Sequence, residues 1–160
     1  MVVGSTGVEE PYDKLVIATG SSAFVPPIRG LESDSGANKD GVFVFRTLDD
    51  CNGIVEHAKR SRKAAVIGGG LLGLEAARGL LALGVEVHVV HLGKHLMDVQ
   101  LDPLGGSILR RAIEDMGIHV HLEKSTQQIL GNEKVEGLRF ADGNELPCDM
   151  VVVSAGIRPN

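Results

Sequence analysis

The sequence predicts an α/β protein built on a parallel sheet, and three observations support this fold class. Residues 64–91 run from an apolar segment through a glycine-rich turn and an alanine- and leucine-rich helical pattern to a valine-rich alternating strand. This strand–helix–strand order is the unit that joins parallel strands. Short strand patterns separated by glycine-containing turns occupy residues 125–147 and predict an antiparallel meander. A further apolar strand at 149–154 is expected to rejoin the parallel sheet.

Composition sets limits on the class of protein. A chain of 160 residues with 43% hydrophobic and 23% charged residues is typical of one main globular domain. A net charge of −5 with only 3% aromatic residues argues against nucleic-acid binding. No apolar run approaches the roughly 20 residues of a membrane span. Cys51 and Cys148 belong to no C-x-x-C pair, which favours a reduced, cytoplasmic protein.

The N-terminal segment reads as a β-hairpin followed by a connector. Val2 and Val3 precede a turn-like stretch, and residues 12–19 have a strand-like pattern. Residues 21–41 are rich in Pro, Gly, Ser and Asp and predict a connector with a mobile middle at 33–40. Because strand patterns lie close to both ends, we expect a domain excised from a longer chain.

The first helix is predicted to begin at Thr47. Thr47 can act as its N-cap, and Asp50 completes a capping-box pattern. The helix is expected to run to about Arg60, with Ile54 and Ala58 on one face.

Another helix is predicted to begin at Asp102 and Pro103, a cap followed by proline at the first helical position. Gly117 should end it, and the alternating residues 118–122 should form a strand. The meander strands are expected at 125–131, 134–140 and 144–147. Apolar residues recur at helical spacing in the helix, at Leu104, Ile108, Leu109, Ala112, Ile113 and Met116.

The glycine motif of the strand–helix–strand unit predicts a Rossmann-like dinucleotide site. Gly68 permits the tight turn out of the strand, and Gly70 lets the backbone approach the phosphates. Gly73 allows the helix to pack closely on the sheet, while the free N–H groups of the helix face the anion. The alternative is a glycine-rich turn without a ligand.

The choice between NADH and NADPH is expected to depend on His91. NAD-preferring proteins place a carboxylate about 20 residues beyond the glycine motif, at the strand end, where this chain has His91. Without a carboxylate there, Lys94 and a protonated imidazole could attract a 2′-phosphate. We therefore expect use of both cofactors. The alternative is that Lys94 and His95 are solvated loop residues.

Histidines at positions 88, 119 and 121 are expected on one face of neighbouring strands. With no Cys, Asp or Glu recognised at ligand spacing, we expect a polar face and no metal site.

Cys51, near a helix start, is interpreted as structural because it has no partner cysteine. Tyr12 lacks a lysine four residues on, so the short-chain dehydrogenase arrangement is absent. A glycine-motif methyltransferase would need an acid where His91 stands.

Several motifs together give a family resemblance that covers the whole chain. YDKLVIATGSS (12–22) and SAGIRPN (154–160) flank the glycine motif. The chain thereby resembles the pyridine-nucleotide-binding domain of flavoprotein reductases with two dinucleotide folds. More narrowly, FRTLDD (45–50), GGGLLGLEAARGL (68–80) and HLMDVQLDPLGG (95–106), with FADG (140–143), resemble the NAD(P)H-dependent nitrite reductase large subunit.

The resemblance implies a division of the chain and a set of cofactors. Residues 1–30 would be the edge of an FAD-binding domain, 31–46 a linker, 47–153 the NAD(P)H-binding domain and 154–160 the return crossing. NAD(P)H would pass hydride to FAD, and in the parent enzyme electrons would reduce nitrite to ammonia. Siroheme and an iron–sulfur cluster would lie outside this chain. Partners would be the dinucleotide and the remaining reductase domains, with self-association left open.

The resemblance also assigns residues. Leu71 and Leu72 would lie beside the nicotinamide, and Glu75 near its carboxamide, although an ion pair with Arg78 is an equal alternative for Glu75. Gly156 would let the return turn approach the cofactor. Residues facing FAD would be Ala18, Thr19 and Gly20. The first FAD-binding glycine motif is missing, so the isolated chain is expected to bind nucleotide without turnover. Alternatives are another flavin reductase, of the rubredoxin, ferredoxin or NADH oxidase type, or a non-catalytic NAD(H)-binding module.

Overall fold

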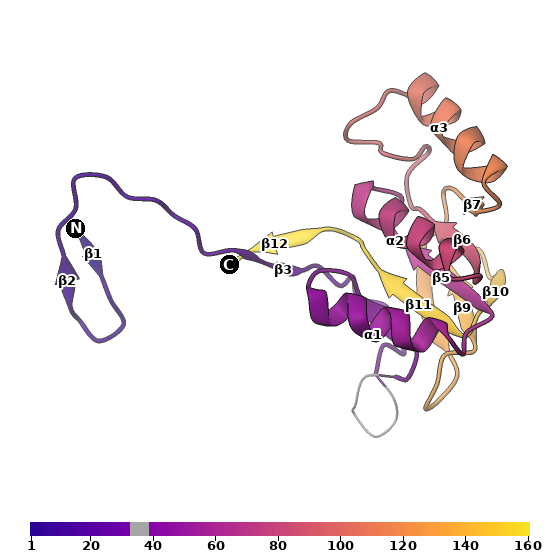
Figure 1. Ribbon diagram of the computed structural model, residues 1–160, viewed down its shortest axis with the longest axis horizontal. Coiled ribbons are helices and arrows are strands. Elements are labelled where there is room, and N and C mark those ends of the chain that lie inside the picture. Colours follow the sequence, from indigo (N-terminus) through magenta and orange to yellow (C-terminus); the bar gives the residue numbers. More distant parts are fainter. Residues whose placement is uncertain (33–38) are drawn as a thin grey trace.

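A computed structural model describes residues 1–32 and 39–160. The predicted mobile middle of the connector therefore lies largely outside the described residues, at 33–38. The architecture confirms the predicted fold class, because helices and an antiparallel meander cover the two faces of a central parallel sheet (Figure 1).

The parallel sheet has five strands in the order β4-β11-β5-β6-β7. Every neighbouring pair is parallel, and the predicted strand–helix–strand unit provides β5, α2 and β6. The strand expected at 149–154 is also confirmed, because β11 inserts between β4 and β5. The strands are β4 (Val42–Val44), β5 (Lys63–Ile67), β6 (Glu86–Val90), β7 (His119–His121) and β11 (Met150–Val153).

Three helices lie on one face of this sheet: α1 (Leu48–Ala58), α2 (Leu71–Ala82) and α3 (Pro103–Asp115). The capping box at the start of α1 forms as predicted, because the Asp50 N–H donates to Thr47 Oγ1 and the Thr47 N–H donates to Asp50 Oδ2. Ile54 and Ala58 of α1 are buried in a core with Ala76, Ala77 and Leu80 of α2. This core provides most of the apolar burial that holds α2 in place.

Helix α3 is less buried than its apolar spacing suggests. Its N-cap is Asp102 with Pro103 at the first position, as predicted. Only Ile113 of the recurring apolar side chains is buried, and Leu109 is partly buried against the core. Leu104, Ile108 and Met116 are each more than half exposed.

The opposite face of the sheet is covered by the predicted meander, whose strand order is β10-β9-β8. Its antiparallel pairs bury Ile129, Leu138 and Phe140 against Ile67 and Val153 of the parallel strands. The strands are β8 (Thr126–Leu130), β9 (Gly137–Phe140) and β10 (Glu145–Pro147).

The N-terminal arm extends away from this body, with a small hairpin at its far end (Figure 1). The hairpin is confirmed, but it pairs β1 (Val2–Val3) with β2 (Glu9–Glu10). The strand predicted at 12–19 is wrong: no strand forms there, and Val16 and Ile17 are 85% and 79% exposed. A strand needs a neighbour for its N–H and C=O groups, and no described segment lies beside this one as a partner strand.

The base of the N-terminal arm and the C-terminal segment meet where they leave the body. Strand β3 (Ser21–Ala23) pairs antiparallel with β12 (Ile157–Pro159), so the two crossings identified in the sequence lie side by side (Figure 1).

The segment interpreted as a linker, 31–46, contains more structure than expected. Residues 42–44 form edge strand β4, which pairs with β11. The ammonium group of buried Lys39 donates to the carbonyl oxygens of Ile129 at 3.2 Å and Gly131 at 2.5 Å. This part of the connector is therefore tied to the sheet and to the meander. No described helix is long and apolar enough to cross a membrane.

Gly73 of α2 allows a direct test of this packing. A Cβ at Gly73 would lie 2.0 Å from the Gly68 carbonyl oxygen, so we expect Gly73→Ala to lower the free energy of unfolding by about 1–3 kcal/mol. Gly79, on the same helix, is the matched control because a Cβ there meets nothing within 4 Å. Gly79→Ala should raise stability by up to about 1 kcal/mol. Chemical denaturation measures both, and equal effects would contradict the packing role of Gly73.

Candidate dinucleotide site

A cleft of about 680 Å³ opens at the carboxyl ends of β5, β6 and β11. Ligands of open α/β sheets bind at this edge, where connections leave the strands in opposite directions. The glycine turn after β5, the loop after β6 and the turn after β11 all contribute to its walls. A second cleft of about 680 Å³ is lined by polar and charged side chains such as Asp40, His57 and Arg60, and among the described residues that line it there is no glycine turn and no helix N-terminus.

The three motif glycines have different surroundings. Gly68 has a φ of +124°, and a Cβ there would lie 2.1 Å from the Ser154 carbonyl oxygen. A Cβ at Gly73 would likewise lie 2.0 Å from the Gly68 carbonyl oxygen. Gly73 is buried and does not line the cleft, so its role is to let α2 pack closely against the turn. At Gly70 a Cβ meets nothing within 4 Å, and Gly70 lines the cleft. The free space beside Gly70 is therefore where a phosphate group can approach the backbone.

The N-terminus of α2 supplies the electrostatic part of the site. Gly70 is its N-cap and makes no side-chain capping hydrogen bond. The first N–H groups of a helix have no partner within the helix, and with the helix dipole they favour an anion. Leu71 and Leu72, which are 59% and 41% exposed, line the cleft as the first residues of α2. They present an apolar surface beside the anion position.

His91 lines the cleft at the end of β6, but its ring has a structural contact. The Gly69 N–H donates to His91 Nδ1 at 3.2 Å, so the ring carries a proton on Nε2. Nε2 is buried and has no hydrogen-bond partner among the described residues. Because both ring nitrogens are enclosed or engaged, the imidazole holds the glycine turn, and its nitrogens are not presented to a ribose.

Position 91 holds no carboxylate, as the sequence shows, but the fold brings one to this strand end from elsewhere in the chain. Asp98 Oδ2 is 3.5 Å from His91 Nε2, and Asp98 lines the cleft. Its side chain is 44% exposed. The carboxylate comes from the loop that folds back after β6, not from the strand itself, so counting along the chain did not find it.

Other predicted residues lie in different places. Gly156 lines the cleft with a φ of +120°, as expected for a close approach. Lys94 is exposed and does not line the cleft. Glu75 is exposed on α2 and does not line the cleft. The ion pairs among the described residues do not include one between Glu75 and Arg78.

Ala18, Thr19 and Gly20 lie on the arm outside the cleft. Thr19 Oγ1 donates to the Asn160 carbonyl oxygen at 3.1 Å, and Asn160 Nδ2 donates to the Thr19 carbonyl oxygen at 3.0 Å. These hydrogen bonds therefore join the segment before β3 to the end of the chain after β12.

The meander contributes cleft residues that the motifs did not indicate. Lys124, Ser125 and Thr126 line the cleft before and within β8. Lys124 forms an ion pair with Asp142, and its ammonium group is 5.5 Å from the centre of the Phe140 ring. These residues follow no glycine motif, and only the folding of the meander onto the sheet brings them here.

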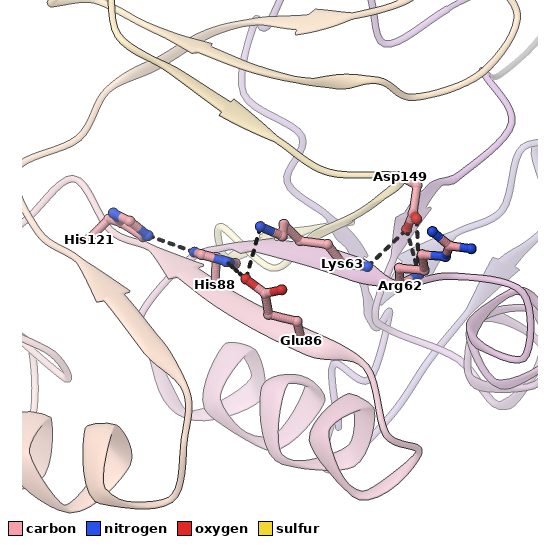
Figure 2. A network of polar contacts seen from close by, with 6 residues as sticks. All are labelled: Arg62, Lys63, Glu86, His88, His121 and Asp149. Atoms are coloured by element: carbon pink, nitrogen blue, oxygen red, sulfur yellow. Dashed lines mark hydrogen bonds and ion pairs between the residues drawn. The ribbon is translucent and has the colours of Figure 1, made fainter.

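A second group of polar side chains, the edge histidine cluster, consists of Glu86, His88, His119 and His121 on β6 and β7. His88 Nε2 is 2.9 Å from Glu86 Oε1, and His88 Nδ1 is 2.9 Å from His121 Nε2 (Figure 2). The statement that no Glu stands at ligand spacing is therefore wrong: Glu86, two residues before His88, shares its face of the strand.

The charge states in the edge histidine cluster follow from its surroundings. The hydrogen bond from Lys63 to Glu86, followed by that from His88, lowers the pKa of this carboxyl to about 2. Burial lowers the pKa of His88 and of His121 below the ordinary imidazole value.

The two cysteines form no disulfide. Burial raises the pKa of the Cys148 thiol to about 12.

Known proteins resemble this chain in both sequence and fold. It is 50% identical over 151 residues to a nitrite reductase [NAD(P)H] of Bacillus subtilis (strain 168), covering 94% of this chain and 18% of that protein. It is 48% identical to the nitrite reductase (NADH) large subunit of Escherichia coli (strain K12), covering 99% of this chain and 18% of the subunit. The chain thus spans about a fifth of the length of these relatives.

Solved structures agree with the sequence relatives. A NAD-dependent persulfide reductase from A. fulgidus superposes with a TM-score of 0.83 at 33% identity, covering 99% of this chain and 28% of that one. A ferredoxin reductase from Rhodopseudomonas palustris gives a TM-score of 0.83 at 30% identity, covering 98% and 37%. The family described as pyridine nucleotide-disulphide oxidoreductase matches residues 2–160. Because this match covers almost the whole chain, the chain belongs to the pyridine nucleotide-disulphide oxidoreductase family of enzymes.

Proposed function

We propose that this chain is the NAD(P)H-binding domain of an FAD-dependent reductase that delivers electrons to nitrite in the complete enzyme. The observation that carries the dinucleotide part is the contrast among the motif glycines. Gly68 and Gly73 are fixed by packing, whereas Gly70 borders open space at a helix N-terminus. That arrangement fits a pyrophosphate group.

The described residues account for binding and orientation. The N–H groups at the start of α2 would receive the pyrophosphate. Leu71 and Leu72 would pack against the nicotinamide and exclude water from it, and Gly156 would let the turn after β11 approach. When bound, NAD(P)H supplies a hydride, which is the chemistry of the cofactor itself.

The flavin would be held by other parts of the parent protein. Ala18, Thr19 and Gly20 lie on the exposed arm and border neither cleft, so they do not form an FAD site by themselves. Val16 and Ile17, largely exposed here, would be covered by the remaining FAD-binding domain. We therefore expect nucleotide binding without turnover from this chain alone.

The nitrite part of the proposal rests on the relatives. Two of them carry the name nitrite reductase at 48% and 50% identity, and a third is an assimilatory nitrate reductase electron transfer subunit of Bacillus subtilis (strain 168) at 45% identity. A NADH oxidase of Methanocaldococcus jannaschii is 40% identical. Another flavin reductase is therefore the second candidate, favoured by that relative.

The glycine contrast predicts the effect of a substitution at Gly70. Gly70→Val would fill the space beside the helix N-terminus, and we expect it to abolish NADH binding measured by titration calorimetry. Thermal unfolding should be little changed, because a Cβ at this position has no neighbour within 4 Å. Gly79→Val on the exposed side of α2 is the matched control and should bind NADH normally. Unchanged NADH affinity in Gly70→Val would contradict the site.

The position of Asp98 predicts a preference for NADH over NADPH. A carboxylate on the cleft wall at the end of β6 would repel a 2′-phosphate, and an exposed charge pair at about 4 Å is worth about 1 kcal/mol. We expect Asp98→Asn to raise the affinity for NADPH relative to NADH about threefold to tenfold. Asp115→Asn, an exposed charge change at the end of α3, is the control. If Asp98→Asn left the ratio of NADH to NADPH affinity unchanged, Asp98 would not be the residue that disfavours the 2′-phosphate.

The terminal acceptor can be tested in the parent protein. The parent should consume nitrite and produce ammonium with NADH as the electron source, and this chain alone should do neither. Its downstream sequence should contain a cysteine cluster for siroheme and iron–sulfur binding. A parent without such cysteines, or one that reduces only another acceptor, would favour the second candidate.

A further inference from the structure

None of the four residues of the edge histidine cluster lines the dinucleotide cleft. Glu86 is the first residue of β6, and His88 and His119 face each other at the middle of β6, whereas His121 is opposite Val90, the last residue of β6, which lines the cleft. The cluster has no part in the proposed function. Its side chains nevertheless include three imidazoles and a carboxylate, which are ligand types of divalent transition metals.

Strand register brings these side chains together. His88 and His119 are directly opposite each other on β6 and β7, and their rings stack with centroids 4.5 Å apart. Glu86 and His88 share one face of β6 because they are two residues apart. One ligand atom from each of Glu86, His88 and His119 lies within 4.8 Å of the other two.

The imidazole of His88 can change its tautomer when a cation binds. A carboxylate only accepts hydrogen bonds, so His88 Nε2 carries the proton toward Glu86 and His88 Nδ1 accepts from His121 Nε2. A metal ion on His88 Nε2 requires the other tautomer, in which Nδ1 donates to His121. Metal-bound histidines regularly donate their second N–H to a fixed partner, which orients the ring. His121 occupies that position.

We propose that Glu86, His88 and His119 bind one divalent transition-metal ion of the zinc class, with His121 as a positioning residue. Ligands at zinc distances are about 3.3 Å from one another in a tetrahedral site. Rotation of the exposed Glu86 and His119 side chains can close the present separations, while buried His88 stays in place. Three protein ligands leave the fourth position to water.

The ammonium group of Lys63 competes with the ion for the Glu86 carboxylate. Its ammonium group is 2.9 Å from Glu86 Oε1 (Figure 2), so a bound cation must share this carboxylate or displace the lysine. The second oxygen of Glu86 offers the alternative. The proposal therefore makes Lys63 a residue whose removal strengthens binding. The ion would cross-link edge strand β7 to β6, and stability would rise with metal concentration.

Zinc titration of the full chain by calorimetry tests the proposal. We expect one Zn²⁺ per chain, with affinity reduced more than about 100-fold in His119→Gln and at least about tenfold in Glu86→Gln. His121→Gln should weaken binding about tenfold to 100-fold, the usual effect of losing an outer partner. Lys63→Met should tighten it. His119 and Glu86 are exposed, so these variants should fold, which circular dichroism verifies.

Controls separate this site from other histidines and from the dinucleotide. His95→Gln, outside the cluster, should bind Zn²⁺ as the unsubstituted chain does. Gly70→Val should lose NADH and keep Zn²⁺, so failure of one proposal is distinguishable from failure of the other. Co²⁺ should give the intense visible absorption of a tetrahedral site, and His119→Gln should abolish it. Equal Zn²⁺ affinity in the unsubstituted chain, His119→Gln and Glu86→Gln would overturn the proposal, as would loss of binding in His95→Gln.

Discussion

The close approach of the α2 N-terminus to the turn after β5 is the constraint on which the cleft depends. Side chains at Gly68 and Gly73 would run into carbonyl oxygens at 2.1 and 2.0 Å, so these backbones touch without intervening atoms. The helix therefore begins directly beside the sheet edge. Its unpaired N–H groups and the carboxyl ends of three strands then face the same cleft. A longer or wider turn would point the helix dipole elsewhere.

Around this contact the site is assembled from segments that are far apart in the chain. His91 holds the middle of the glycine turn through Gly69, and the Ser154 carbonyl, directly after strand β11, lies against Gly68. The sheet order β11-β5-β6 places these segments next to one another. The turn is thus supported from both neighbouring strands, which keeps its geometry ready for a ligand before one binds.

Features coded by local chemistry could be predicted from the sequence, and features made by tertiary contact could not. The capping box at Thr47, the Asp102–Pro103 helix start and the meander depend on residues close in the chain. Asp98 reaches the end of β6 only because its loop folds back. Residues 12–19 have the composition of a strand, but β structure also needs a partner, which no local pattern supplies.

The histidine face shows the same dependence on register. Alternation along β6 directs Val87 and Val89 into the helix-side core, so His88 must face the other side, where the meander packs. Burying an imidazole is costly unless its nitrogens are paired, and Glu86 and His121 pair both of them. These partners come from the same strand and from the neighbouring edge strand. The polar contacts that make His88 tolerable in the fold are thus the ones that place several metal-ligand side chains together.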